Sequence, residues 1–172
     1  TEQDVSLDGI LVIDYDGTII LYNRRFREMW GVPEYVLEHR SDEMLLEYVV
    51  ERVADPVPFR AKIHYLYEHP EDKSHEEITL KDGRVLDRYS VSMISADGTN
   101  FGRVWYFRDI TERRKIEDEV RTLKNYLANI IDSTPSVLVG IDPEMNVTIL
   151  NRLAEKMINL TSDEALGKPL GH

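Results

Sequence analysis

Two carboxylates stand two residues apart at the end of an apolar run, in the segment Ile10-Leu-Val-Ile-Asp14-Tyr-Asp16-Gly17-Thr18. This is the strongest apparent catalytic motif of the chain, because paired carboxylates can transfer protons, attack a substrate or hold a metal ion. The same residues also suit a plain hairpin turn, since glycine tolerates a positive φ and aspartate hydrogen-bonds its own backbone. The elements on either side of the motif must decide between these two roles.

The composition of the chain narrows the classes of function. A chain of 172 residues can hold one full domain and a piece of a second. The net charge of −11 argues against nucleic-acid binding, which relies on clustered lysine and arginine. No apolar run approaches the ~18 residues of a membrane span and no secretory leader is visible, so we expect a cytoplasmic segment without membrane contact. Without cysteine there is no thiol nucleophile and no thiolate metal site.

The hydrophobic pattern predicts two strands, several short helices, three strands and a long helix, in that order. The first two strands flank the Asp16-Gly17 turn and run antiparallel. Asn23 closes the second strand and can cap the first short helix, while Ser41 can cap the third. The predicted strands are 9–14, 18–22, 76–80, 84–94 and 101–109, and the predicted helices are 24–30, 34–38, 42–54, 59–68 and 111–133.

The long helix carries a narrow apolar stripe. Its apolar residues alternate at spacings of four and three, which makes an a/d seam of two heptads. We predict that this seam joins two copies of the chain in a homodimer. The alternative is that the helix lays the stripe on its own domain. The stripe consists of Ile116, Val120, Leu123, Leu127 and Ile130.

A second copy of the opening pattern begins at Ser133. The aligned residues preserve a strand, a turn, a second strand and a helix together. We therefore infer an internal repeat whose second copy ends before its last three strands. An offset of 128 positions aligns, without a gap, Ile13 with Ile141, Asp14 with Asp142, Asn23 with Asn151, Arg24 with Arg152 and Met29 with Met157.

The carboxylate motif resembles the first motif of the haloacid-dehalogenase-like phosphatases, an apolar strand followed by Asp-x-Asp-Gly-Thr. The resemblance implies that Asp14 is a nucleophile and Asp16 a general acid, with magnesium beside them. Against it, the next segment reads as the return strand of a hairpin, where that fold needs a crossover, and the later chain lacks alternating strand–helix units. The second copy also has Glu144 and Met145 at the positions of Asp16 and Gly17. We favour the hairpin turn and keep the magnesium-dependent phosphatase as an alternative of a different class.

Several stretches resemble motifs of the PAS family, and they follow one another in that family's order. The resemblance covers essentially the whole chain. It implies an α+β PAS fold, in which a five-stranded antiparallel sheet carries short helices on one face and is followed by a long linker helix. The stretches are residues 8–14 and 17–23 (first two strands), Met29-Trp30-Gly31 (end of the first helix), Lys81-Asp82-Gly83-Arg84 (hairpin of the third and fourth strands), 102–113 (last strand and the Asp-Ile-Thr junction of bacterial sensor proteins) and 133–170, ending Gly167-Lys-Pro-Leu170 (first half of another PAS domain).

The resemblance implies a PAS domain over residues 1–110, a linker helix over 111–133 and a truncated second PAS domain over 134–172. PAS domains commonly form dimers and precede an output domain, so we predict a sensory or relay module of a two-component sensor histidine kinase. A diguanylate cyclase or a purely dimerising module is the alternative of the same class. We find no kinase histidine motif, nucleotide-binding glycine loop or cyclase signature, so we expect an output domain further along the same protein and no enzyme in this chain.

The resemblance also implies a small cavity between the sheet and the helices. Its occupant is a small molecule or nothing, because the same apolar residues would form a well-packed core. The absence of cysteine excludes flavin-adduct and thiol-linked chromophores. Haem would need an axial imidazole from His64 or His69, and a lone helical histidine more often lies on the surface, so haem is not expected. The predicted pocket residues are Met44, Leu45, Val49, Ile63, Tyr67, Trp105 and Phe107.

The junction between the last strand and the long helix is the predicted route of the signal. Asp109 can cap the helix by accepting from the N–H of Glu112, or it can pair with an arginine, and Thr111 can cap one turn later. The helix macrodipole disfavours the basic cluster that follows, so we expect its cations to pair with acids elsewhere. The predicted junction residues are Asp109, Thr111 and Arg113, with Arg84, Arg88 and Arg113 as possible partners of Asp109.

Overall fold

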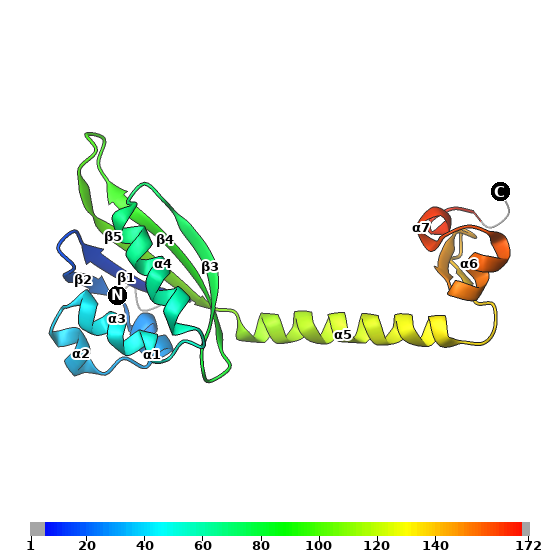
Figure 1. The fold of residues 1–172 in the computed structure, drawn as a ribbon, viewed down its shortest axis with the longest axis horizontal. Coiled ribbons are helices and arrows are strands. Elements are labelled where there is room, and N and C mark those ends of the chain that lie inside the picture. Colours follow the sequence, from blue (N-terminus) through cyan, green and yellow to red (C-terminus); the bar gives the residue numbers. More distant parts are fainter. Residues whose placement is uncertain (1–5, 170–172) are drawn as a thin grey trace. The chain divides into compact units, whose positions relative to one another are not determined.

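The structure, a computed structural model, describes residues 6–169 (Figure 1). These residues form two compact units, which divide between Lys115 and Ile116. Leu170, at the end of the last predicted motif, lies outside the described residues, as do the extreme ends of the two predicted PAS segments. Within the described range, no helix is long and apolar enough to cross a membrane.

The first unit is an antiparallel sheet with four helices packed against one face (Figure 1). The strand order is β2-β1-β5-β4-β3, and every neighbouring pair is antiparallel. This confirms the predicted α+β fold with its five-stranded sheet. The elements are β1 (Gly9–Asp14), β2 (Ile19–Tyr22), α1 (Arg24–Trp30), α2 (Glu34–Glu38), α3 (Asp42–Val50), α4 (Pro56–Glu68), β3 (Ser74–Thr79), β4 (Val85–Ile94) and β5 (Asn100–Asp109), followed by α5 (Thr111–Ser133).

Two helix ends differ from the sequence-based prediction. The third helix ends at Val50, four residues early, because Val53 leaves the helix to form a β-bridge with Leu80. The fourth helix begins at Pro56, three residues early, because proline is well suited to the first helical turn, where its missing N–H is not needed. Tertiary pairing explains the first difference and local helix chemistry explains the second.

The Asp14 motif forms a hairpin turn. One oxygen of the Asp14 carboxylate accepts from the backbone N–H of Asp16 at 2.9 Å and from that of Thr18 at 2.8 Å. Gly17 has a φ of 80°, which the turn requires. The flanking strands β1 and β2 pair antiparallel, so the crossover of the phosphatase fold is absent here. The carboxylate thus completes a turn, as the hairpin interpretation predicted.

Asn23 ties the first helix to the first strand. Its side-chain oxygen accepts from the N–H of Phe26 and from the N–H of Ile10, both at 2.9 Å. Its amide nitrogen donates to the carbonyl of Asp8 at 2.8 Å. The side chain is buried, so each of these bonds replaces one to water that is no longer available. Asn23 therefore sets the angle at which α1 leaves the sheet.

The second unit contains the hairpin β6 (Val139–Ile141) and β7 (Val147–Leu150), then α6 (Arg152–Ile158) and α7 (Ser162–Ala165). Asn151 makes the same three bonds as Asn23, to Ala154, Leu138 and Ser136. Each of these partners lies 128 positions after its counterpart. The offset also relates two left-handed turn residues, two helix ends, two β-bridges and two strand bulges. These pairs are Gly17 with Met145, Gly31 with Asn159, the bridge Thr18–Ser41 with Asn146–Pro169, and the bulge at Val12–Ile13 with that at Gly140–Ile141.

We expect the substitution Asn23→Ala to lower the free energy of unfolding of the first unit by about 1–3 kcal/mol, because three buried hydrogen bonds lose one partner. Both tryptophans of the chain, Trp30 and Trp105, lie in this unit, so tryptophan fluorescence during urea unfolding reports on it alone. The matched variant Asn151→Ala should leave this transition unchanged. Equal midpoints for Asn23→Ala and the wild type would contradict the role of Asn23.

Candidate functional site

Six of the seven predicted pocket residues line one small internal cavity of about 30 Å³ between the helices and the sheet. Met44 does not, and its side chain is 39% exposed. The inward stripe of α3 consists of Leu45, Leu46, Val49 and Val50, and Met44 lies just outside it. The six lining residues are Leu45, Val49, Ile63, Tyr67, Trp105 and Phe107.

Aromatic rings from the first and fourth helices complete the wall of this inner cavity. Trp30 lies 5.4 Å from Phe107 and 6.3 Å from Phe59 between ring centroids, and Phe26 lies 5.6 Å from Phe107. All four side chains line the cavity. Such tilted and edge-on pairs are favourable beyond the area they bury. The cavity is therefore a largely apolar space with mainly aromatic walls.

Arg88 of β4 is a wall residue that the sequence analysis did not place in the cavity. Its side chain is fully buried, and its guanidinium lies 4.9 Å from the Phe59 ring centroid and 5.2 Å from that of Trp105. One nitrogen, Nη2, donates to Glu76 at 2.6 Å. Burial lowers the pKa of Arg88, and the hydrogen bond and charge of Glu76 oppose that effect. The alternation of β4 could have revealed it, because Leu86, Arg88 and Ser90 share the inward face.

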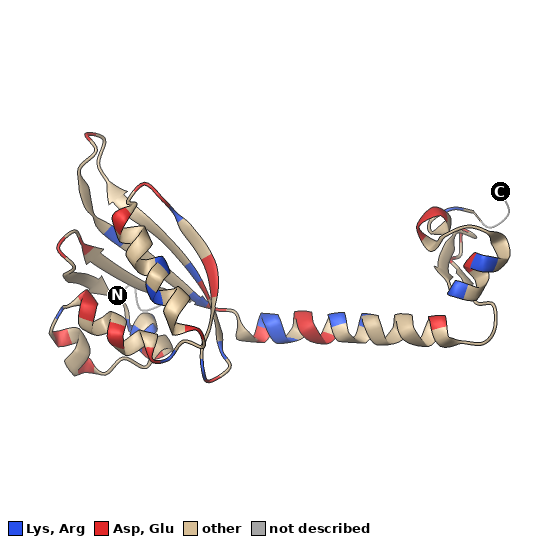
Figure 2. Cartoon of the chain, viewed as in Figure 1, with Lys and Arg blue, Asp and Glu red and all other residues tan. Residues whose placement is uncertain are grey.

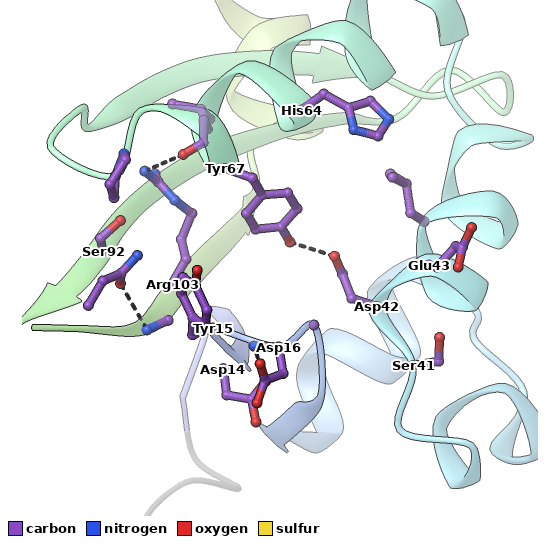
Figure 3. A pocket seen from close by; sticks show the side chains of 16 residues that line it. Asp14, Tyr15, Asp16, Ser41, Asp42, Glu43, His64, Tyr67, Ser92 and Arg103 are labelled. Carbon is purple, nitrogen blue, oxygen red and sulfur yellow. Dashed lines mark hydrogen bonds between the residues drawn. The ribbon is translucent and has the colours of Figure 1, made fainter.

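A larger cleft of about 470 Å³ lies outside the inner cavity, lined by the Asp14 turn, the start of α3, the end of α4 and the β4–β5 hairpin (Figure 3). Tyr67 and Asp42 line both spaces, and the Tyr67 hydroxyl donates to Asp42 at 2.6 Å. Burial raises the pKa of Asp42, and the hydrogen bond from Tyr67 opposes this. Burial also raises the pKa of Tyr67, as do the charge of Asp42 and the bond to it. This pair stands between the cleft and the inner cavity.

Arg103 of β5 also lines the cleft, but its hydrogen bonds are structural. Its guanidinium donates to the carbonyls of Leu66 at 3.1 Å and Asp72 at 2.9 Å, and to the hydroxyl of Ser90 at 2.8 Å. Burial lowers its pKa. Arg103 therefore anchors the end of α4 and the following loop to the sheet.

The two histidines considered for haem are both on α4 or at its end. His64 is exposed and lines the outer cleft, whereas His69 stacks on the ring of Tyr65 with centroids 4.1 Å apart. Neither lines the inner cavity. Among residues 6–169, no three histidine, aspartate or glutamate side chains gather in a way that could hold a metal ion.

The strand–helix junction differs from the predicted cap. The Asp109 carboxylate accepts from the N–H of Thr111 at 3.0 Å and from its hydroxyl at 2.5 Å, not from Glu112. The Thr111 hydroxyl oxygen in turn accepts from the N–H of Val85 at 3.0 Å, and the carbonyl of Val85 accepts from the N–H of Ile110 at 3.0 Å. The first residue of α5 is thus bonded to the first residue of β4.

Two of the three possible arginine partners of Asp109, Arg84 and Arg88, pair with other acids. Arg84 donates to Asp82 at 2.9 Å, and Arg88 is paired with Glu76. Within the basic cluster at the start of α5, Arg114 donates from Nε to Glu77 of β3 at 2.9 Å. Arg113 lies exposed in the same first turn. The pairing of Arg114 offsets the unfavourable position of a cation at a helix N-terminus.

The apolar stripe of α5 is uncovered. Figure 2 shows that charged residues crowd the first half of this helix and thin out along the second half. None of the helix is buried, and the five stripe residues are between 45% and 57% exposed. A continuous exposed apolar stripe on a long helix is a feature of surfaces that bind another protein chain.

Comparison with known proteins places these features in a family. A model of the PAS fold matches residues 6–118. The probable diguanylate cyclase DgcE of Escherichia coli (strain K12) is 30% identical over an alignment of 120 positions, and the match covers 59% of this chain and only 11% of that protein. The PAS domain of BvgS from Bordetella pertussis is 21% identical with a TM-score of 0.50, and the match covers 73% of this chain and 93% of that one. The sensor region of a sensor histidine kinase is 16% identical with a TM-score of 0.48, over 62% of this chain and 40% of that one.

Proposed function

Because the chain belongs to the PAS family, we propose that its first unit is a sensory or relay module that acts through α5. A ligand- or partner-dependent change in the sheet would pass through the junction of Asp109 and Thr111 to this helix. The observation that carries the proposal is the bond from the N–H of Val85 to the Thr111 hydroxyl, which joins the sheet to the first residue of α5.

The two central strands connect the inner cavity to this junction. On β4, Arg88 lines the cavity and Val85 lies at the junction, three residues away. On β5, Phe107 lines the cavity and Asp109 lies at the junction, two residues away. A strand is stiff over so short a distance because its backbone is held on both sides. A shift of the cavity wall would therefore change the geometry of the Asp109–Thr111 bonds.

The apolar stripe of α5 supports a homodimer in which two such helices pair in parallel. Its spacing of four and three suits a short left-handed coiled coil. We expect the wild-type chain to sediment as a dimer at tens of micromolar in analytical ultracentrifugation. Leu123→Asp should weaken the dimer at least about tenfold, because it buries an unpaired charge in the seam. Thr122→Asp adds the same charge on the neighbouring outer face and should leave the dimer intact, and a monomeric wild type would rule the proposal out.

We expect Asp109→Ala to loosen the junction while the sheet stays folded. Loss of the two bonds to Thr111 should cost the first turn of α5 about 1 kcal/mol, as for a lost helix cap. Hydrogen–deuterium exchange should show faster exchange at residues 111–114 and unchanged protection in β4 and β5. Glu112→Ala, in the same turn, is the matched control. Unchanged signalling by the longer natural protein carrying Asp109→Ala would remove the coupling role.

The second unit is proposed to be the first half of another PAS domain, as the repeat suggests. Positions that are core in the first unit are exposed apolar residues in the second. In the first unit, β1 pairs with β2 on one edge and with β5 on the other. The equivalent strand of the second unit, β6, pairs only with β7 among the described residues. The equivalent pairs are Leu11 and Val139, Ile13 and Ile141, Met29 and Met157, Trp30 and Ile158, and Val32 and Leu160, the first of each pair being buried and the second exposed.

Methionine oxidation tests this half-domain. Met29 is 3% exposed and its counterpart Met157 is 74% exposed, so dilute hydrogen peroxide should oxidise Met157 far faster in the 172-residue chain. In the longer natural protein, further strands should cover this face and reduce the rate at Met157 to nearly that at Met29. Mass spectrometry of the two peptides gives both rates in one sample. Equally rapid oxidation of Met157 in both proteins would argue against a completed second domain.

Two alternative output domains, a histidine kinase and a diguanylate cyclase, are proposed for the longer protein. This chain itself is proposed to carry no catalytic domain. The Asp-Ile-Thr junction resembles that of bacterial sensor proteins, which favours a histidine kinase. The similarity to a probable diguanylate cyclase favours a cyclase instead. Autophosphorylation from ATP and cyclic-dinucleotide formation from GTP by the longer protein distinguish the two, and a protein with neither activity would leave the purely dimerising module.

A further inference from the structure

Arg88 places an incompletely bonded cation in the wall of an apolar cavity. Its side chain is fully buried, and Glu76 accepts a hydrogen bond from only one of its nitrogens, Nη2. Among residues 6–169, neither Nε nor Nη1 has a hydrogen-bond partner, and the indole N–H of Trp30 in the same wall has none either. Buried donors without an acceptor are costly and rare in folded proteins. The free donors in this wall therefore have no acceptor of their own, because the Asp42 carboxylate, which also lines the cavity, accepts from Tyr67.

The charge around Arg88 indicates what kind of acceptor fits. Glu76 already forms an ion pair with the guanidinium, so the local charge is balanced before anything enters. A second carboxylate would have to lose its hydration without a free cation to neutralise it. A neutral oxygen acceptor, such as a ketone or amide carbonyl, satisfies the free donors without that cost.

The size and the walls of the cavity indicate how such a molecule is held. Aromatic and aliphatic side chains make up nearly all of the lining, so the body of the ligand is apolar. The cavity of about 30 Å³ has room for one or two water molecules only. It adjoins the cleft of about 470 Å³ at Leu46 and at the hydrogen-bonded pair Tyr67 and Asp42, since all three residues line both spaces (Figure 3). Opening the Tyr67–Asp42 hydrogen bond would widen the connection between the two spaces.

We propose that Arg88 anchors an internal site for a small, uncharged, mainly apolar molecule with a carbonyl-type acceptor, which enters when the Tyr67–Asp42 hydrogen bond opens. The acceptor bonds to the free guanidinium donors, and the apolar body displaces Tyr67 toward the cleft. This inference rests on the proposed sensory function and gives it a ligand class. Binding to the purified chain can fail while the dimer and the junction behave as proposed, so the two failures are distinguishable.

Three probes of similar size test the ligand class: acetophenone with a ketone, ethylbenzene with no acceptor and benzoate with a charge. In ¹H–¹⁵N spectra of the 172-residue chain, the two tryptophan indole signals and the Arg88 Nε–H signal report on the cavity. Acetophenone should shift all three signals and bind at least about tenfold tighter than ethylbenzene, because a hydrogen bond to a charged donor is gained. Benzoate should bind more weakly than acetophenone.

Arg88→Met should abolish the preference for acetophenone over ethylbenzene, whereas Arg60→Met, at an exposed position of α4, should preserve it. Tyr67→Phe removes the hydrogen bond to Asp42 and should speed the association of acetophenone. The comparison of the three probes on the wild type stands even if Arg88→Met fails to fold. Equal affinity for acetophenone and ethylbenzene, tighter binding of benzoate, or no shift of the indole signals, as expected of a cavity holding only water, would overturn the site. An unchanged association rate in Tyr67→Phe would overturn the entry route.

Discussion

Leu86 of β4 pairs with Asp109 of β5, and this antiparallel register runs from there along both strands to Arg103. Because side chains alternate between the two faces of a sheet, the register also determines which residues face the helices. On β4 the inward residues include Arg88, and on β5 they include Trp105 and Phe107. The ends of the same two strands form the junction with α5. The inner cavity and the start of the helix therefore share one rigid support.

The sheet carries two buried arginines, which differ in how many of their nitrogens have hydrogen-bond partners. Arg103 donates to backbone carbonyls and to the hydroxyl of Ser90, so its burial is offset by good acceptors. Arg88 has one carboxylate partner and two nitrogens without any among the described residues. Both lie on central strands, where a charge is costly to bury. The first holds a helix end in place, and the second leaves donors free in a cavity.

The two units use the same local geometry with different outcomes for burial. Asn23 and Asn151 make equivalent hydrogen bonds, and Gly17 and Met145 both adopt positive φ. These features depend only on residues within one hairpin and one short helix. Burial of the facing apolar residues depends on distant strands, which the first unit has and the described part of the second lacks. The local geometry therefore does not require the core that covers it in the first unit.

Whether a feature could be predicted from the sequence depends on how far apart along the chain its interacting residues lie. The sequence alone sufficed to predict the features that rest on neighbouring residues, namely the order of the elements along the chain, the hairpin at Asp14, the caps at Asn23 and Ser41 and the bounds of α5. The bond from the N–H of Val85 to Thr111 joins residues 26 positions apart, and Asp109 turned to Thr111 instead of Glu112. The exclusion of Met44 from the cavity and the entry of Arg88 into it likewise depend on how α3 and α4 pack on the sheet. Strand alternation can place Arg88 on the inward face of β4, but it does not show which of its nitrogens find a partner, because the candidate partners lie on other elements. The sequence determined the order and type of the elements, and only the tertiary packing decided which polar groups are enclosed and left without partners.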